Sequence, residues 1–382
     1  MRIRLMKRSL RISEGGSKYV GNLPLGCQLC MRGQKLVLFM GGKCYQPAHC
    51  RWYCPISLKR RSSEQIYADE IEVTKPDDII KEAKKIKALG CSFTGGDPLG
   101  SEDHRELTLF YLDELKREFG VDFHTHLYTS GIDFSSELAN ELAAAGLNEI
   151  RFHPAETDFH RIEYALDYGM DVGAEVPAIP TIEQEEYIWN LIDYLDTIGA
   201  NFINLNEFEM TASNFKSLKK RGFELKDQDM AAVKGSRELA EKILEEIPER
   251  YTLSVHFCPS RLKDGVQVRN RYKRRAESIQ RPYEDVTDDG TLLFLRIQGD
   301  AINLKKFYDE LLNESNVPEK MMNLSMDHGQ SHLDLPWFLA DDKNLMAAIT
   351  DYDLKGGIME TLPFRGQHCE ICEYTPLIRS KK

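Results

Sequence analysis

Three cysteines stand close together on one short stretch of the chain, GGKCYQPAHCRWYCP. Cys44, Cys50 and Cys54 are separated by five and then three residues. Three thiolates on a single loop can hold three irons of a [4Fe-4S] cluster and leave the fourth iron open to an outside ligand. Because an open iron is reactive, the triad predicts iron–sulfur chemistry.

Structural zinc is the alternative for this triad, with His49 as a fourth ligand. The adjacent side chains of His49 and Cys50 point poorly toward one tetrahedral ion, and zinc alone would not explain the glycine turn described below. The iron–sulfur interpretation is therefore favoured.

Two further cysteine pairs have the C-x2-C spacing, Cys27 with Cys30 and Cys369 with Cys372. Each pair supplies two thiolates, and four thiolates complete a closed metal site. We expect a second site joining the two ends of the chain, with zinc and a second [4Fe-4S] cluster both open. Four free thiols are the alternative, and Cys258 could replace one ligand or serve the substrate.

The stretch TGGDPL, residues 94–99, stands at the end of the second predicted strand. Glycines at the carboxyl end of a parallel strand let the backbone come close to a ligand, and open α/β sheets bind small molecules at that edge. We expect the turn and the triad to face the same crevice.

The elements that must position these motifs alternate regularly between short β-like runs and helical patterns. Six strand–helix units in series favour a parallel sheet with right-handed crossovers, and they are too few for a closed eight-unit barrel. The sequence therefore predicts an α/β fold with a partial (β/α)6 barrel, whose strands are 35–40, 92–94, 122–129, 149–153, 171–176 and 202–206.

The rhythm changes from Thr291 to the order β-α-β-β-α-β, which predicts a C-terminal ferredoxin-like α+β domain for recognition of a substrate or partner. The predicted organisation has four parts. Residues 1–34 are an N-terminal segment with a metal pair, and residues 35–260 form the barrel. Residues 261–290 are a basic helix with a linker, and residues 291–382 form this last domain.

Composition limits the class of protein. The chain has 382 residues, nine cysteines and a net charge of −11. No apolar run approaches the roughly 20 residues that span a bilayer, and the N-terminus lacks a secretory pattern, so we expect a cytoplasmic protein without a membrane segment. The basic stretch 261–281 could grip RNA phosphates, although a solvated helix face is the commoner explanation.

The cysteine triad after the first strand, Tyr53 just before its last cysteine, and the Gly-Gly-acid-Pro turn together resemble the radical S-adenosylmethionine (SAM) superfamily. The stretch from GCQLC through KLVLFMGGKC, YCPIS and TGGDPL also resembles a largely archaeal group related to pyruvate formate-lyase activating enzymes. The resemblance covers residues 25–210, and 260–277 more loosely. The superfamily's usual C-x3-C-x2-C spacing is C-x5-C-x3-C here, which affects the placing of Tyr53 against the adenine.

The resemblance implies a radical SAM enzyme of unknown substrate. SAM would bind the open iron, with its amino group against the backbone of Gly95, Gly96, Asp97 and Pro98. An electron from a donor such as ferredoxin or flavodoxin would cleave SAM to methionine and a 5′-deoxyadenosyl radical, which takes hydrogen from the substrate. A peptide, an RNA and a small metabolite all remain open as that substrate.

Polar residues at the predicted strand ends lie where the resemblance would place the ribose and carboxylate of SAM. They are Thr129, Ser130, Arg151, His153, Asn206 and Glu207, each of which could equally be a cap or a solvated loop residue. Two rivals contain no SAM chemistry, a zinc-stapled RNA-binding protein and an iron–sulfur electron carrier. The TGGDPL turn argues against both.

Overall fold

The computed structural model describes residues 8–45, 48–156, 158–229, 231–315, 317–326, 331–365 and 370–377. The chain divides into two compact units, residues 1–268 and 269–382. The division falls inside the segment 261–290, which the sequence marks as a basic helix and linker. Each unit has its own sheet and its own apolar core.

Unit 1 is built on an eleven-stranded sheet, counted over the described residues. Seven of its described strands run parallel in the order of the chain. Six coincide with the predicted strands and the last is additional: β3 (Lys35–Phe39), β6 (Gly90–Thr94), β7 (His124–Thr129), β8 (Glu149–Phe152), β9 (Asp171–Ala178), β10 (Phe202–Glu207) and β11 (Ser254–Cys258).

Short antiparallel strands extend both edges of this sheet. β2 (Lys18–Val20) pairs with β11 and carries β1 (Arg11–Ile12), while β4 (Tyr67–Ala68) pairs with β3 and carries β5 (Ile71–Glu72). β1 and β5 are the two ends of the strand order, so the sheet curves without closing. The predicted partial barrel is confirmed, with one more parallel strand than expected.

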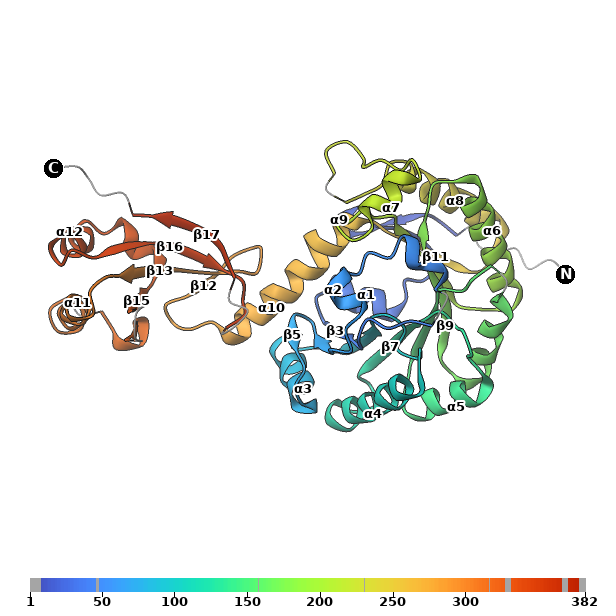
Figure 1. The fold of residues 1–382 in the computed structure, drawn as a ribbon, viewed down its shortest axis with the longest axis horizontal. Coiled ribbons are helices and arrows are strands. Elements are labelled where there is room, and N and C mark those ends of the chain that lie inside the picture. Colours follow the sequence, from blue (N-terminus) through green and yellow to red (C-terminus); the bar gives the residue numbers. More distant parts are fainter. Residues whose placement is uncertain are drawn as a thin grey trace. The chain divides into compact units, whose positions relative to one another are not determined.

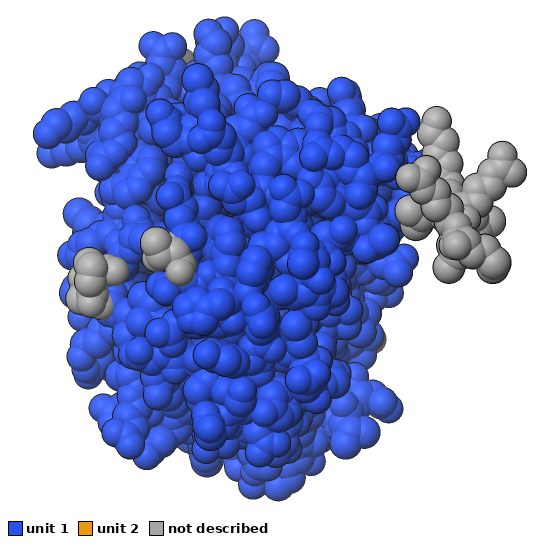
Figure 2. All heavy atoms as spheres, turned by 90° about the vertical axis from the view of Figure 1, so that its right-hand side faces the viewer, with its two compact units in different colours: residues 1–268 blue, residues 269–382 orange. Residues whose placement is uncertain are grey.

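Helices cover the outer face of the curved sheet (Figure 1), and Figure 2 shows the surface of unit 1 from the right-hand side of that view. Ser101, Ser135 and Thr181 cap three of them, because each hydroxyl accepts a hydrogen bond from a backbone N–H of the first turn. The covering helices are α3 (Pro76–Lys85), α4 (Glu102–Phe119), α5 (Ser136–Ala144), α6 (Ile182–Thr197) and α8 (Ser236–Arg250). Between β8 and β9 the covering element is the 3-10 helix η3 (Phe159–Tyr168).

A short helix, α1 (Leu25–Met31), lies inside the curve of the sheet (Figure 1). Its Gly26 faces strands β7 and β8 so closely that a Cβ there would stand 2.7 Å from both His126 Nδ1 and Arg151 Nη2. Only a glycine allows this approach. The helix thereby carries Cys27 and Cys30 into the barrel.

Unit 2 contains the βαββαβ order that the sequence predicts, and its sheet order β14-β15-β13-β16 confirms the ferredoxin-like fold. One antiparallel strand, β17 (Ile371–Pro376), is added beside β16. The elements are α10 (Arg269–Ile279), β12 (Asp285–Val286), β13 (Leu292–Gln298), α11 (Ala301–Asn313), β14 (Asn323–Ser325), β15 (His332–Leu335), α12 (Lys343–Asp351) and β16 (Lys355–Thr361).

The basic stretch that begins unit 2 is partly used for packing. Arg275 on α10 is buried, donates to the carbonyl of Pro363 and lies 4.3 Å from the ring centre of Phe364. That arginine is therefore a core residue. Among the described residues, no helix is both long and apolar enough to cross a bilayer.

Phe307 is fully buried in the core of unit 2. Phe307→Ala should lower the free energy of unfolding of this unit by about 3–5 kcal/mol, because the truncated ring leaves a cavity. Faster amide hydrogen exchange in residues 292–361 measures the loss. Ile302→Ala on the same helix, where the side chain is 66% exposed, should change the free energy of unfolding by less than about 0.5 kcal/mol. Equal effects of the two changes would contradict this packing.

Candidate active site

The segments that follow β3 and β6 lie against each other through their backbones. Gly96 N donates to Gly41 O at 2.7 Å, and Asp97 N donates to Lys43 O at 2.9 Å. A Cβ on Gly96 would stand 1.9 Å from Lys43 O. Because β3 and β6 are parallel neighbours, this contact brings the cysteine segment and the glycine turn to one edge of the sheet.

Asp97 fixes the glycine turn to the end of β7. Its carboxylate, in a side chain only 4% exposed, accepts from Ser130 Oγ at 2.6 Å, Ser130 N at 2.8 Å and Thr129 Oγ1 at 3.0 Å. The same carboxylate accepts from Leu99 N at 3.0 Å. The structure thus brings together three residues expected near SAM, and their mutual bonds make them positioning groups.

Pro98 and the end of the turn are held from the other side. Thr108 Oγ1 on α4 donates to Pro98 O at 2.9 Å, and Tyr45 Oη donates to Leu99 O at 2.7 Å. Tyr45 directly follows Cys44, so this bond links the turn to the cysteine segment a second time.

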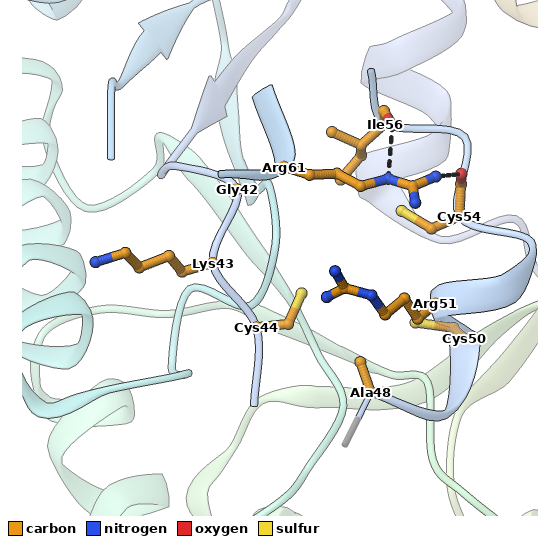
Figure 3. Close-up of a pocket in the computed structure, with 9 residues that line it drawn as sticks. All are labelled: Gly42, Lys43, Cys44, Ala48, Cys50, Arg51, Cys54, Ile56 and Arg61. Carbon is orange, nitrogen blue, oxygen red and sulfur yellow. Dashed lines mark hydrogen bonds between the residues drawn. The ribbon is translucent and has the colours of Figure 1, made fainter. Parts of the chain in front are cut away.

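Cys44, Cys50 and Cys54 line one cavity of about 290 Å³ (Figure 3). Cys50 lies on the 3-10 helix η2 (His49–Trp52), and the segment after it is braced by Arg61, which donates to the carbonyls of Cys54 and Ile56. The triad therefore surrounds one space, which the backbone of Gly42 also lines.

The chemistry of this donor set fits an iron–sulfur cluster. Burial and the neighbouring thiols raise the pKa of Cys44 to about 12 and that of Cys50 to about 11, so bound metal must displace these protons. Around one zinc ion, with Zn–S of about 2.3 Å, ligand sulfurs stand about 3.8 Å apart. Among described side chains, the trio with ligand atoms all within 4.8 Å of one another contains no cysteine. The wider spread suits thiolates that bind separate irons.

Tyr53 is anchored next to the triad. Its hydroxyl lies 2.7 Å from His153 Nε2, directly after β8, and Asn214 Nδ2 donates to its carbonyl at 2.8 Å. Burial, reinforced by nearby His49, lowers the pKa of His153 to about 3, so the imidazole in this hydrogen bond is neutral. The segment carrying Cys50 and Cys54 is therefore bound to the ends of β8 and β10.

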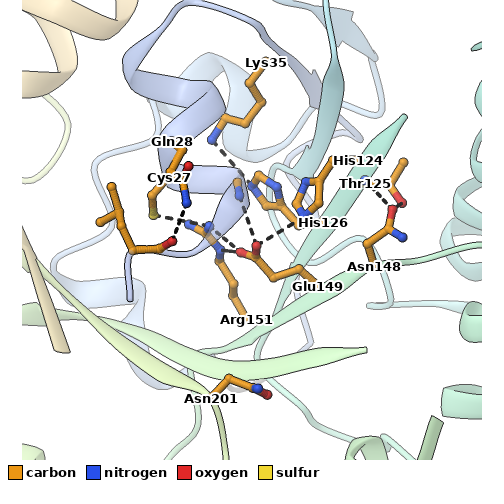
Figure 4. A network of polar contacts seen from close by, with 12 residues as sticks. Cys27, Gln28, Lys35, His124, Thr125, His126, Asn148, Glu149, Arg151 and Asn201 are labelled. Carbon is orange, nitrogen blue, oxygen red and sulfur yellow. Dashed lines mark hydrogen bonds and ion pairs between the residues drawn. The ribbon is translucent and has the colours of Figure 1, made fainter. Parts of the chain in front are cut away.

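Deeper in the barrel, Arg151 on β8 lies between Glu149 and Cys27 (Figure 4), and its bonds continue to Glu175 on β9. Arg151 Nε donates to Glu149 Oε1 at 2.5 Å, and Arg151 Nη1 donates to Glu175 Oε2 at 2.7 Å. Asn204 and Asn206 donate to the two oxygens of Glu175 at 2.9 Å each. Burial raises the pKa of both carboxyls, but the guanidinium and the hydrogen bonds that each carboxylate accepts together outweigh it and hold each pKa at about 2.

This network explains the one trio with metal-ligand spacing among the described residues, His124, His126 and Glu149. Glu149 already accepts from Arg151 and, at 3.1 Å, from Gly26 N. The guanidinium beside the carboxylate repels a cation. We therefore assign the trio to the ion-pair network.

A second cavity, of about 130 Å³, lies inside the barrel and is lined by Cys27, Cys30 and Cys258. Of the expected partners of the first pair, Cys369 lies outside the described residues and Cys372 is exposed on β17 of unit 2, so a site shared by the two pairs stays a prediction. Within unit 1, Cys258 is thus the thiol that meets the Cys27 and Cys30 pair.

Several residues of this cavity are absent from the sequence-based predictions. They occupy alternate positions on strands that parallel sheets usually make apolar, which is the signal that could have found them. They are Lys35, Glu175, Asn204 and His256, which follow the same inward face as Arg151, Asn206 and Cys258.

Arg151→Met should lower the free energy of unfolding at pH 7 by about 3–5 kcal/mol, because it leaves two buried carboxylates unpaired. The pH dependence should also change sign. In the wild type, the pKa values near 2 are below the usual glutamate value of 4.5, so this stabilisation is present above pH 4.5 and is lost as the pH falls toward 2. In the variant, protonation of the unpaired carboxyls should instead be stabilising as the pH falls from 7.

Urea unfolding at several pH values measures both effects. Arg117→Met, which removes an exposed pair with Glu114, is the matched control and should cost less than about 1 kcal/mol. Parallel pH curves for wild type and Arg151→Met would contradict the assigned network.

Comparisons with known proteins place these features in context. A family model described as the radical SAM superfamily matches residues 24–195. A candidate glycyl-radical enzyme activating enzyme of Methanocaldococcus jannaschii is 41% identical over 308 residues, which is 77% of this chain and 79% of that protein. The PqqA peptide cyclase of Streptomyces rochei is 28% identical over 114 residues, 29% of this chain and 28% of the cyclase.

Solved structures with similar folds include two SAM-related proteins. SuiB of Streptococcus suis bound to SAM has 15% identity and a TM-score of 0.39, over 61% of this chain and 53% of SuiB. The radical SAM methyltransferase TsrM of Kitasatospora setae, with tryptophan and a SAM analogue bound, has 12% identity and a TM-score of 0.35, over 54% and 44% of the two chains.

Proposed function

This chain belongs to the radical SAM superfamily and is an enzyme of SAM-dependent radical chemistry, and from that premise we propose that it cleaves SAM at a [4Fe-4S] cluster held by Cys44, Cys50 and Cys54. The observation that carries the proposal is the backbone contact between the segment of the triad and the glycine turn. When bound, the cluster would supply one electron that divides SAM into methionine and a 5′-deoxyadenosyl radical.

The chain's own groups would bind and orient SAM at this edge. The amides of Gly96 and Asp97 already donate to the cysteine segment, so the SAM ammonium, which is itself a donor, needs carbonyl acceptors. The carbonyls of Gly95 and Gly96 are our candidates. Arg151 and Asn206 lie deeper and are bonded to Glu175. They would therefore fix the inner wall of the barrel and would not bind SAM directly.

We propose a polypeptide substrate, namely a glycyl-radical enzyme. The support is the Methanocaldococcus jannaschii relative, whose name describes activation of such an enzyme. The radical would take one hydrogen atom from a glycine Cα, which gives 5′-deoxyadenosine and a glycyl radical. A donor of the ferredoxin or flavodoxin class would supply the electron, and the ferredoxin-like unit 2 would recognise the polypeptide.

The substrate class can be tested with glycyl-radical enzymes encoded in the same genome. Each is mixed with the reduced, reconstituted protein and SAM, and electron paramagnetic resonance then detects a glycyl radical on the partner. A radical that appears with equal amounts of 5′-deoxyadenosine supports the assignment. Deoxyadenosine without any partner radical would reject the glycyl-radical enzymes while leaving SAM cleavage intact.

Replacing the triad should abolish SAM cleavage. Cys44→Ala, Cys50→Ala or Cys54→Ala each removes a ligand from a three-thiolate cluster, so 5′-deoxyadenosine formation should fall to background and the iron content should drop by about four atoms per chain. Chromatography of the nucleoside and metal analysis measure the two losses. Cys91→Ala, which changes a buried cysteine of β6, is the control and should keep both. Turnover by all three triad variants would overturn the proposal.

Gly96→Ala should weaken SAM binding by tenfold or more, because the new Cβ must push Lys43 O away and so separate the turn from the triad. Calorimetric titration of the reconstituted protein with SAM gives the Kd. Gly265→Ala is the matched control, since a Cβ there would meet no atom within 4 Å. An unchanged Kd for Gly96→Ala would show that the turn does not contact SAM.

A further inference from the structure

We propose that Cys27, Cys30 and Cys258 bind a second iron–sulfur cluster inside the barrel of unit 1. This site differs from the expected one, because it needs neither Cys369 nor Cys372. It is independent of SAM cleavage at the triad and can be tested without it.

Helix α1 and strand β11, which are far apart in the sequence, meet at this cavity. Cys27 and Cys30 are one helical turn apart on α1, and Cys258 is the last residue of β11. All three line the same cavity of about 130 Å³, several times the volume that one water molecule needs. Met31 and Val266 pack with Cys258 and Leu262, so apolar contacts hold α1 against the segment after β11.

The three thiols are reduced, and side-chain donors point at two of them. None of the described cysteines forms a disulfide. Arg151 Nη2 and Asn204 Nδ2 each donate to Cys27 Sγ at 3.4 Å, and Gln267 Nε2 lies 3.9 Å from Cys258 Sγ. Donors aimed at ligand sulfurs are the outer contacts that orient metal ligands and tune Fe–S clusters.

Lys35 supplies an unusual charge at the same place. Its ammonium lines the cavity, its side chain is 7% exposed, and its Nζ lies 3.5 Å from His126 Nε2. Glu175 lines the same cavity but is already bonded to Arg151. Thiolates that bind a metal would supply further negative charge beside Lys35.

The spacing of the sulfurs selects a cluster over a single ion. Described side chains include no cysteine trio with all sulfurs within 4.8 Å of one another, whereas one zinc ion would hold them about 3.8 Å apart. Thiolates bound to different irons can stand further apart. Three protein ligands would again leave one iron for another donor.

The decisive experiment uses the full-length chain with Cys44, Cys50 and Cys54 all changed to alanine, reconstituted anaerobically with iron and sulfide. About four irons and four sulfides per chain should remain, and adding Cys258→Ala should remove them. Adding Cys91→Ala or Cys372→Ala should leave them in place. Zinc in place of iron, loss of metal with Cys372→Ala, or a triad variant without iron would each overturn the proposal.

A second measurement does not depend on the folding of the Cys258 variant. Lys35→Gln in the triad-free chain should keep the iron and lower the reduction potential of the cluster, since a nearby positive charge stabilises the more negative reduced state. Potentiometric titration followed by electron paramagnetic resonance measures the shift. An unchanged potential would show that the remaining cluster is not in this cavity.

Discussion

The site depends on two backbones that touch without side chains between them. Residues 41–43 follow β3 and residues 95–97 follow β6, and the amides of the second segment bond to the carbonyls of the first. A Cβ on Gly42 would stand 1.8 Å from Arg60 O, and one on Gly96 would stand 1.9 Å from Lys43 O. The glycines are thus required by contact, and the triad and the turn keep a fixed relation because no flexible side chain separates them.

The interior of the barrel imposes a second constraint. Inward positions of a closed barrel are usually filled by branched apolar side chains, but here β8, β9 and β10 present Arg151, Glu175 and Asn204. Buried charges are tolerated only when they are paired and hydrogen-bonded, and Arg151 meets that condition with two carboxylates. These polar side chains line the cavity of about 130 Å³ inside the barrel.

The strands and the order of elements can be predicted from local sequence pattern, whereas contacts between distant segments cannot. Six parallel strands and the ferredoxin-like order of unit 2 show in the alternation of apolar runs, because each element buries its own stripe. Strand β11, Ser254–Cys258, is absent from the predicted set and follows a long segment after β10 that contains two helices, α7 (Phe215–Lys220) and α8. Thr129 and Ser130 lie at the predicted edge, yet their bond to Asp97 depends on the turn of a neighbouring strand. The meeting of Cys258 with Cys27 depends on sheet order, which spacing along the chain does not contain.

Strand β8 connects the two cysteine sites. On its inner face, Glu149 accepts from Gly26 N of α1 and Arg151 donates to Cys27 Sγ. His153, two residues further, binds Tyr53 beside the triad. Alternate residues of a strand share a face, so a shift of one residue in the pairing of β8 would turn all three away from the barrel. The register of β8 against β7 and β9, from Tyr128↔Arg151 to Arg151↔Gly173, therefore sets the level of both sites at once.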